Sequence, residues 1–495
     1  MGVRFVSSDT SLGRRRSLVG AAMALSTIAA LMGCATPVPQ ALSSRIVPTT
    51  FSQTPQSPPE AWPSSQWWQA FGSPQLSEFV NTAEANNQDL AAATARVLEA
   101  RAQTTVQRSA LFPQLTGQSL AQRANGSSTT GSSTQSISSE PTSTSNTFGL
   151  SISASYEVDL WGLTRANVRA AAEKLKSARF ARETLALTMT ANVANAYFNV
   201  LTLRERIAIT NEDIEAINSI LAVIELRVST GKSSHLDLAQ ERAQVEAVEA
   251  QLPMLEEQEL EVRTTLALLL GQPLQALAIR EVSPEAIHTP AVGPGLAPDL
   301  LTRRPDVAEA EANLASAHAN LDAARAAFLP QFSLVGDAGY ASTAIGTLLR
   351  GPSFVWDAGF NLAQTVFDGG KLVGQKRLAA ATEQELIATY RGAVLNAYAD
   401  VENALGEVTS NRKAEEHLRH EVDSAREAFD ISQLQYRQGV TDLLIVLQAQ
   451  QTLFAARDQL AQVELARLQA AVHLYEALGG GWTEAAADRT QLTLR

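Results

Sequence analysis

Cysteine is almost absent from this sequence. Cys34 is the single cysteine among 495 residues, which excludes an intramolecular disulfide and a thiolate metal cluster. No run of 18 apolar residues occurs, so a helical membrane span is not expected. The chain also lacks a Gly-x-Ser-x-Gly motif, and its carboxylates fall into helix charge patterns. The sequence therefore predicts neither an enzyme nor a cofactor.

Two short segments imitate ligand sites. Gly231-Lys232-Ser233 resembles the end of a phosphate-binding loop, but Leu226 stands where the first glycine belongs, and a helix precedes the segment instead of a strand. A second segment, with Glu416, His417, His420 and Glu421, could present metal ligands on one helix. An exposed coiled-coil face explains these four side chains equally well, and we expect no metal there.

Positive charge is also scarce. The formal net charge is −12, and removal of residues 1–33, which carry four arginines and one aspartate, would bring it to about −15. An acidic chain of this kind repels the phosphate backbone, so nucleic acid is not an expected partner.

The N-terminus has the features of a secretory signal peptide. Three arginines, Arg14 to Arg16, precede an apolar stretch from Leu18 to Leu31. Leu31-Met32-Gly33-Cys34 resembles the lipobox of bacterial lipoproteins, although Met32 is unusual there. The resemblance implies cleavage after residue 33 and lipidation of Cys34. Ala35 is not the aspartate that retains such proteins at the inner membrane, so the outer membrane is implied. An ordinary signal with an incidental cysteine, or a twin-arginine route, is the alternative.

The mature chain repeats itself. Gly162, Gly231 and Gly271 recur 208 residues later as Gly370, Gly439 and Gly479, which indicates two copies of one unit. We place the copies at residues 75–271 and 304–480. An extended, proline-rich segment, 34–74, precedes them, a linker, 272–303, joins them, and a tail, 481–495, follows.

Each copy is predicted to contain a helix, two strands, a long helix and a further helix, and the first helix of the first copy is predicted over residues 75–110. The predicted strands are 112–124, 148–161, 329–341 and 353–367. The predicted helices after each strand pair are 163–228, 235–270, 370–436 and 441–478. Apolar residues in the long helices alternate steps of three and four over several heptads, which predicts antiparallel coiled-coil packing. Pro253 should kink its helix.

The strands carry the strongest functional signal. Residues 150–161 and 354–366 alternate apolar and polar side chains, so each strand has one apolar face. A soluble sandwich and a transmembrane barrel are the two explanations, and four strands are too few for either alone. Two chains would supply eight strands and three would supply twelve. Because an eight-stranded barrel leaves little interior space, we expect a homotrimer around a hollow tube.

Four motifs, in this order and spacing, resemble the TolC-like outer-membrane factors, in particular the lipidated NodT-type branch of RND drug-efflux systems. They are Trp67-Trp68-Gln69-Ala70-Phe71, Arg304-Pro305-Asp306-Val307, Phe367-Asp368-Gly369-Gly370 and Tyr436-Arg437-Gln438-Gly439-Val440. The resemblance implies a mainly α fold with a small β part. In that fold the long coiled-coil helices form an α-barrel, and four strands per chain join a trimeric 12-stranded β-barrel.

The resemblance also implies a function. It predicts the outer-membrane channel of a tripartite efflux pump, which exports small toxic compounds from the periplasm. Its partners would be a periplasmic adaptor, an inner-membrane RND-type transporter and outer-membrane lipid. Alternatives are the outer-membrane duct of type I secretion and a non-conducting coiled-coil scaffold lipoprotein of the envelope.

The resemblance places a periplasmic gate at the two helix turns. Asp237 and Tyr436 match a pair that latches neighbouring helices in the family, and Leu444 matches a residue that faces the constriction. Gln448 replaces the aspartate that rings the pore in many relatives, so cation block should be weak. Structural core packing explains Leu444 nearly as well.

The same turns match the tips that contact the adaptor hairpin. The tip residues implied are Gly231, Gly439, Val440 and Thr441. Thr441 stands where some relatives carry an arginine that strengthens the latch, so the closed state should depend less on charge here.

Overall fold

A computed structural model describes residues 64–126, 143–280, 284, 287–290 and 302–483. These residues all belong to one compact unit, Pro48–Arg495. The predicted signal peptide, the lipidation site Cys34 and most of the extended segment lie outside the described residues, as do most of the C-terminal tail and parts of the linker 272–303.

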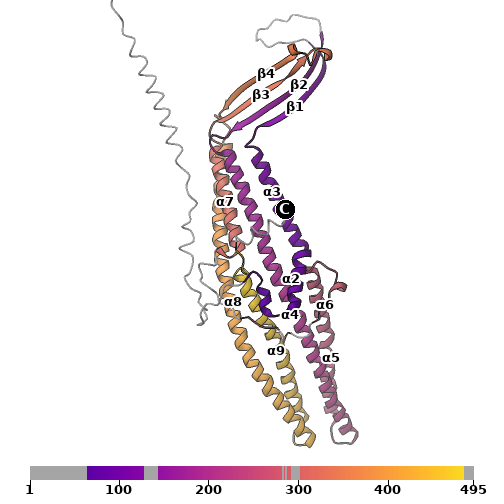
Figure 1. The fold of residues 1–495 in the computed structure, drawn as a ribbon. Coiled ribbons are helices and arrows are strands. Elements are labelled where there is room, and N and C mark those ends of the chain that lie inside the picture. The colour runs from indigo at the N-terminus through magenta and orange to yellow at the C-terminus, as the bar shows by residue number, and fades with distance from the viewer. Residues whose placement is uncertain (1–63, 127–142, 281–283, 285–286, 291–301, 484–495) are drawn as a thin grey trace, which may run out of the picture. The chain divides into compact units, whose positions relative to one another are not determined.

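The two halves of the unit have the same order of elements. The first half contains the helices α2 (Pro74–Asn86) and α3 (Gln88–Ser109), the strands β1 (Gln114–Gly126) and β2 (Ser143–Val158), and the helices α4 (Leu163–Ser229), α5 (His235–Glu249) and α6 (Gln251–Leu269). The second half contains α7 (Pro305–Ala326), β3 (Gln331–Ser342), β4 (Phe354–Ala363), α8 (Lys371–Gln438) and α9 (Leu443–Ala477). Figure 1 shows the strands beyond one end of the helices and the turns α4–α5 and α8–α9 at the other.

The two long helices start at matching glycines. α4 follows Gly162 and α8 follows Gly370, both in the left-handed conformation, and the helices run for 67 and 68 residues. At 1.5 Å per residue each is about 100 Å long. In the described part of the chain, no helix combines the length and apolar character needed to cross a membrane.

Two predicted helices are interrupted. We expected one helix over residues 75–110, but Asn87 divides it into α2 and α3. Its side chain accepts a hydrogen bond from the Leu90 N–H at 3.0 Å and donates one to the Leu269 carbonyl at 2.9 Å. A side-chain acceptor at this position caps a new helix. The single helix predicted over 235–270 is also divided, because Pro253 has no N–H to donate and the helix breaks at Ala250.

The four strands form one antiparallel sheet in the order β1-β2-β3-β4. Leu150 of β2 lies opposite Tyr340 of β3, which lies opposite Phe354 of β4. Two residues along, Ile152 and Ala338 are likewise opposite each other, and Trp356 completes that row. Because residues opposite one another in a sheet share a face, the apolar sides predicted for the separate strands combine into one surface. β4 ends at Ala363, four residues before its predicted end.

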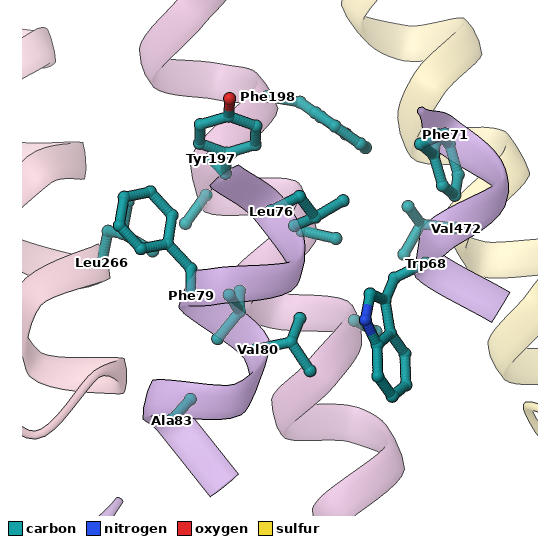
Figure 2. Close-up of a cluster of buried hydrophobic side chains, with 14 of the residues drawn as sticks. Trp68, Phe71, Leu76, Phe79, Val80, Ala83, Tyr197, Phe198, Leu266 and Val472 are labelled. Carbon is teal, nitrogen blue, oxygen red and sulfur yellow. The ribbon is translucent and has the colours of Figure 1, made fainter. Parts of the chain in front are cut away.

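The main core lies midway along the helices and includes the short 3₁₀ helix η2 (Trp67–Phe71). Trp67 stacks on Tyr475 of α9, with ring centroids 5.1 Å apart, and Phe71 contacts Phe198 of α4. Figure 2 shows the cluster around Leu76 and Phe79, with side chains from α2, α4, α6 and α9. The first segment of the described chain is therefore fixed to both halves of the unit.

Candidate functional site

The turn between α4 and α5 is fixed by its own hydrogen bonds. Gly231 has φ +66°, and Ser234 begins α5 with a capping box. In this box the Asp237 N–H donates to the Ser234 hydroxyl at 3.1 Å, and the Ser234 N–H donates to the Asp237 carboxylate at 3.0 Å. The Ser233 hydroxyl donates to the same carboxylate at 2.6 Å. The Ser233 bond, followed by the Ser234 N–H, holds the pKa of Asp237 below its ordinary value.

The turn between α8 and α9 has a glycine cap. Gly439 has φ +75°; its N–H donates to the Tyr436 carbonyl at 3.0 Å, and the Val440 N–H donates to the Gln435 carbonyl at 2.9 Å. These bonds satisfy carbonyls that the helix end would otherwise leave unpaired. Val440, Leu444 and Gln448 are exposed, and Thr441 is half-buried. The exposed side chains are thus available to a second chain.

Tyr436 is buried at this turn and contacts α4, the helix that leads into the other turn. The Arg227 guanidinium, in the last turn of α4, lies 4.4 Å from the centroid of the Tyr436 ring. Arg227 Nη2 also donates to the Tyr436 carbonyl at 2.9 Å and to the Arg437 carbonyl at 3.0 Å. Among the described residues, the Tyr436 hydroxyl has no hydrogen-bond partner.

The structure therefore brings Tyr436 to Arg227 instead of to Asp237. The Asp237 carboxylate accepts from Ser233 and Ser234 at Oδ2, and no hydrogen bond joins it to Tyr436 within the described chain. The role of Arg227 was not predicted from the sequence. One signal was available, because a basic side chain in the last turn of a helix often binds exposed carbonyls.

Two buried polar residues lie on the helices that follow these turns. Glu241 of α5 and Gln450 of α9 are both fully buried, and none of their four side-chain oxygen and nitrogen atoms has a hydrogen-bond partner in the described structure. Each lies one helical turn from an apolar residue of the seam between the helix hairpins α4–α5 and α8–α9. These apolar residues are Val245 and Phe454, respectively. Burial raises the pKa of Glu241 from 4.5 to about 7. The sequence pattern did not predict the burial of either residue.

The four side chains that could have been metal ligands do not form a cluster. Within the ranges that the structure describes, no group of three or more His, Cys, Asp or Glu side chains is arranged to hold a metal ion. His417, His420, Glu416 and Glu421 are all exposed on α8. They lie on a solvated face of that helix.

The second candidate surface is the apolar face of the sheet. Its side chains come from three strands, and many are exposed, including Trp356 at 71% and Phe360 at 79%. The row partners of Trp356 are Ala338 and Ile152, so small and large apolar groups alternate across the face. Figure 1 shows no helix packed over the sheet. An uncovered apolar surface of this kind is typical of contact with lipid or with another protein.

Comparison with known proteins gives a consistent family. The family model described as outer membrane efflux protein matches residues 79–272 and 296–480. The pyoverdine export outer membrane protein OpmQ of Pseudomonas aeruginosa is 38% identical over 417 residues, which cover 84% of this chain and 87% of OpmQ. The probable outer membrane lipoprotein SilC of Salmonella typhimurium is 28% identical and covers 93% of this chain and 99% of SilC.

Solved structures give the same fold. The outer-membrane channel OprN superposes with a TM-score of 0.83 at 26% identity, covering 88% of this chain and 97% of that chain. The arrangement of helices and strands in the present chain is therefore that of an outer-membrane channel protein.

Proposed function

Because the chain belongs to the outer membrane efflux protein family, we propose that it forms the outer-membrane duct of a tripartite export pump. The predicted family, the mainly helical fold with a small β part and the outer-membrane efflux role are confirmed. The assembly, the partners, the gate and the lipid anchor are proposals, each supported by its own observation.

The observation that carries the proposal is the apolar face of the sheet. A soluble protein would cover it with a second layer, whereas Trp356, Phe360 and their neighbours are exposed. The strands are 10 to 16 residues long, long enough to cross the hydrocarbon core. Lipid contact explains both facts.

The edges of the sheet support assembly as a homotrimer. β1 and β4 are the two edge strands, and each leaves one row of backbone groups without a partner in the sheet. Lipid provides no hydrogen bonds, so these edges must pair with other strands. Three chains would give a closed wall of about twelve strands with an open interior. The helices would extend this wall as a tube into the periplasm.

The position of Trp67 is consistent with lipidation of Cys34. The core that holds Trp67 lies about 50 Å along α4 from the sheet, since 35 residues separate Leu163 from Phe198. The 33 residue steps from Cys34 to Trp67 can extend to about 100 Å. An acylated Cys34 could therefore reach the outer membrane while Trp67 stays in the core.

The turns at the opposite end form the proposed periplasmic entrance. Gly231, Gly439, Val440 and Thr441 would contact the adaptor hairpin, and an inner-membrane RND-type transporter would supply the energy. Leu444 and Gln448 are exposed near the tip, where copies of one chain would meet. A ring of Leu444 would close the entrance by apolar contact, and uncharged Gln448 should bind cations weakly.

The proposed cargo is a small molecule. Toxic compounds are the first candidate. The relative OpmQ is named for pyoverdine export, which makes a secreted small metabolite the second. A deletion strain distinguishes them, because the first predicts greater sensitivity to toxic compounds and the second predicts a metabolite retained in the cell. Type I secretion of a protein remains the alternative within the same architecture.

The test is conductance in planar bilayers. The purified full-length protein should insert and give small, discrete conductance steps, because its entrance is closed at rest. A coiled-coil scaffold would give no steps at any voltage. Absence of steps from protein that is folded and oligomeric would therefore reject the duct.

A further inference from the structure

We propose that Arg227 is the residue that holds the two helix hairpins of one chain together at the entrance. In this inference the closed tip depends on the Arg227 guanidinium, the Tyr436 ring and the end of α8, and not on a bond between the Tyr436 hydroxyl and Asp237. The inference rests on the proposed duct and names the residue that sets its closed state.

The geometry adds a polar contact between two hairpins that also share an apolar cluster near their tips. Arg227 belongs to α4 of the first hairpin, while Tyr436 and Arg437 belong to α8 of the second. The guanidinium donates to two carbonyls at 2.9 and 3.0 Å and lies 4.4 Å from the ring centroid. A cation at this place meets the negative end of the α8 dipole, the last free carbonyls and the face of an aromatic ring.

Few other polar contacts exist at this level. Arg457 of α9 pairs with Asp213 of α4 at 2.6 Å, but Asp213 lies 14 residues before Arg227, about 20 Å up the helix. Between these points, the described chain has one other hydrogen bond between the hairpins, from Gln451 to Gln244 at 3.0 Å, and it is exposed. Arg227 is therefore the charged contact placed to resist separation of the tips.

The alternative latch is not formed here. The Asp237 carboxylate accepts from Ser233 and Ser234 at Oδ2, and neither of its oxygens is bonded to Tyr436 in the described chain. The Tyr436 hydroxyl is buried and has no partner. The ring, in contrast, packs among the apolar residues of the seam between the hairpins, which include Ile224 and Phe429. Tyr436 thus contributes its ring and its carbonyl to the contact.

The first test compares two arginines in planar bilayers. Arg227→Gln should raise the mean conductance about tenfold or more, since charge-assisted hydrogen bonds and a cation–π contact are lost together. Arg242→Gln is the matched control, because Arg242 also bridges two helices, by an ion pair to Glu225 at 2.9 Å, but within one hairpin. It should conduct as the wild type does. Equal conductance of Arg227→Gln and the wild type overturns the inference.

The second test separates the ring of Tyr436 from its hydroxyl. Tyr436→Leu should raise the conductance toward that of Arg227→Gln, whereas Tyr436→Phe should give less than a tenth of that increase. An increase in Tyr436→Phe as large as that in Tyr436→Leu would assign the latch to the hydroxyl and overturn the inference. Arg227→Lys keeps the charge but loses the planar guanidinium that faces the Tyr436 ring. Its conductance should therefore lie between those of the wild type and Arg227→Gln.

These tests separate the inference from the proposed function. If the wild type and all variants fail to conduct, the duct itself is rejected. If the wild type conducts and Arg227→Gln does not exceed it, only the role of Arg227 is rejected. Size-exclusion chromatography of each variant before recording shows that the protein is assembled, so that a folding defect is not read as a gating effect.

Discussion

A carboxyl group without a partner is the most unusual single residue of the seam. Glu241 faces α4 from α5, between the apolar clusters that contain Ile224 and Val245. Desolvation alone raises its pKa to about 7. The nearby charges are either paired, as Arg242 is with Glu225, or exposed. The folded protein therefore holds a proton on Glu241 over a pH range in which the unfolded chain has lost it.

This difference predicts a stability that falls with pH. Below about 4.5 both states are protonated, and between 4.5 and about 7 only the folded state retains the proton. The contribution of Glu241 to stability should decrease through that window and level off above it, with a loss of roughly 3 kcal/mol. Glu241→Gln should remove this contribution, so that stability falls less with pH than in the wild type, as measured by thermal unfolding at several pH values.

The matched control is Glu246→Gln on the same helix, where the side chain is exposed. It should leave the pH dependence of the wild type unchanged. A thermal midpoint of Glu241→Gln that falls with pH as steeply as that of the wild type would contradict the assignment.

Single residues of the turns were predictable only in part. Gly231 and Gly439 could be assigned because a reversal between long helices needs a positive φ. The partner of Tyr436 could not, because heptad periodicity fixes the face of a helix but not which carbonyl a long side chain reaches. The burial of Glu241 was not predicted, because the residue itself is charged and the adjacent Gln240 and Arg242 are polar or charged.

At the scale of elements, helix lengths and turns followed from the sequence, since apolar periodicity and paired glycines define them. The interruption at Asn87 was missed, because an alanine-rich segment resembles a continuous helix and the hydrogen bond from Asn87 to the Leu269 carbonyl involves a distant part of the chain. Pro253 indicated a kink, and the helix is broken three residues earlier. Local sequence signals thus predict where a helix lies better than they predict where it is interrupted.

The end of α6 provides a prediction at this scale. Gly271 has φ +65°, and a Cβ there would lie 2.3 Å from the Asn86 carbonyl oxygen. Gly271→Ala should destabilise the protein by roughly 3 kcal/mol or more, through backbone strain and the clash together. Gly231→Ala shares the strained φ, +66°, but meets no atom within 4 Å.

The control variant should therefore lose only about 1–2 kcal/mol. Denaturant unfolding of both variants gives the comparison. A Gly271→Ala protein as stable as Gly231→Ala would show that the approach of α2 to α6 adjusts freely.

At the scale of the whole molecule, the apolar face of the sheet links the apolar–polar alternation of the strands to the location of the protein in the outer membrane. The alternation in each strand was evident because side chains in strands alternate sides. The pairing of β2 with β3, across the two repeats, could not be predicted from alternation, since any register of equal parity keeps the faces intact. Assembly therefore has to be tested directly.

Two neighbouring residues on β4 test which face contacts lipid. Trp356 lies on the apolar face, and Val355 points to the other side and pairs with Gly339. Trp356→Arg should reduce membrane assembly, because an arginine facing the bilayer core costs roughly 2–4 kcal/mol. Val355→Arg should assemble nearly as the wild type does. Heat-resistant oligomer in membrane fractions measures both, and the reverse order would mean that the opposite face contacts lipid.

The central claim is that one chain cannot complete its own wall and that identical copies finish it. Native mass spectrometry of the full-length protein, released from detergent micelles, measures the number of chains per particle most directly. The account predicts three chains, with β1 of each copy paired to β4 of the next. A stable single chain, with both sheet edges free, would contradict it.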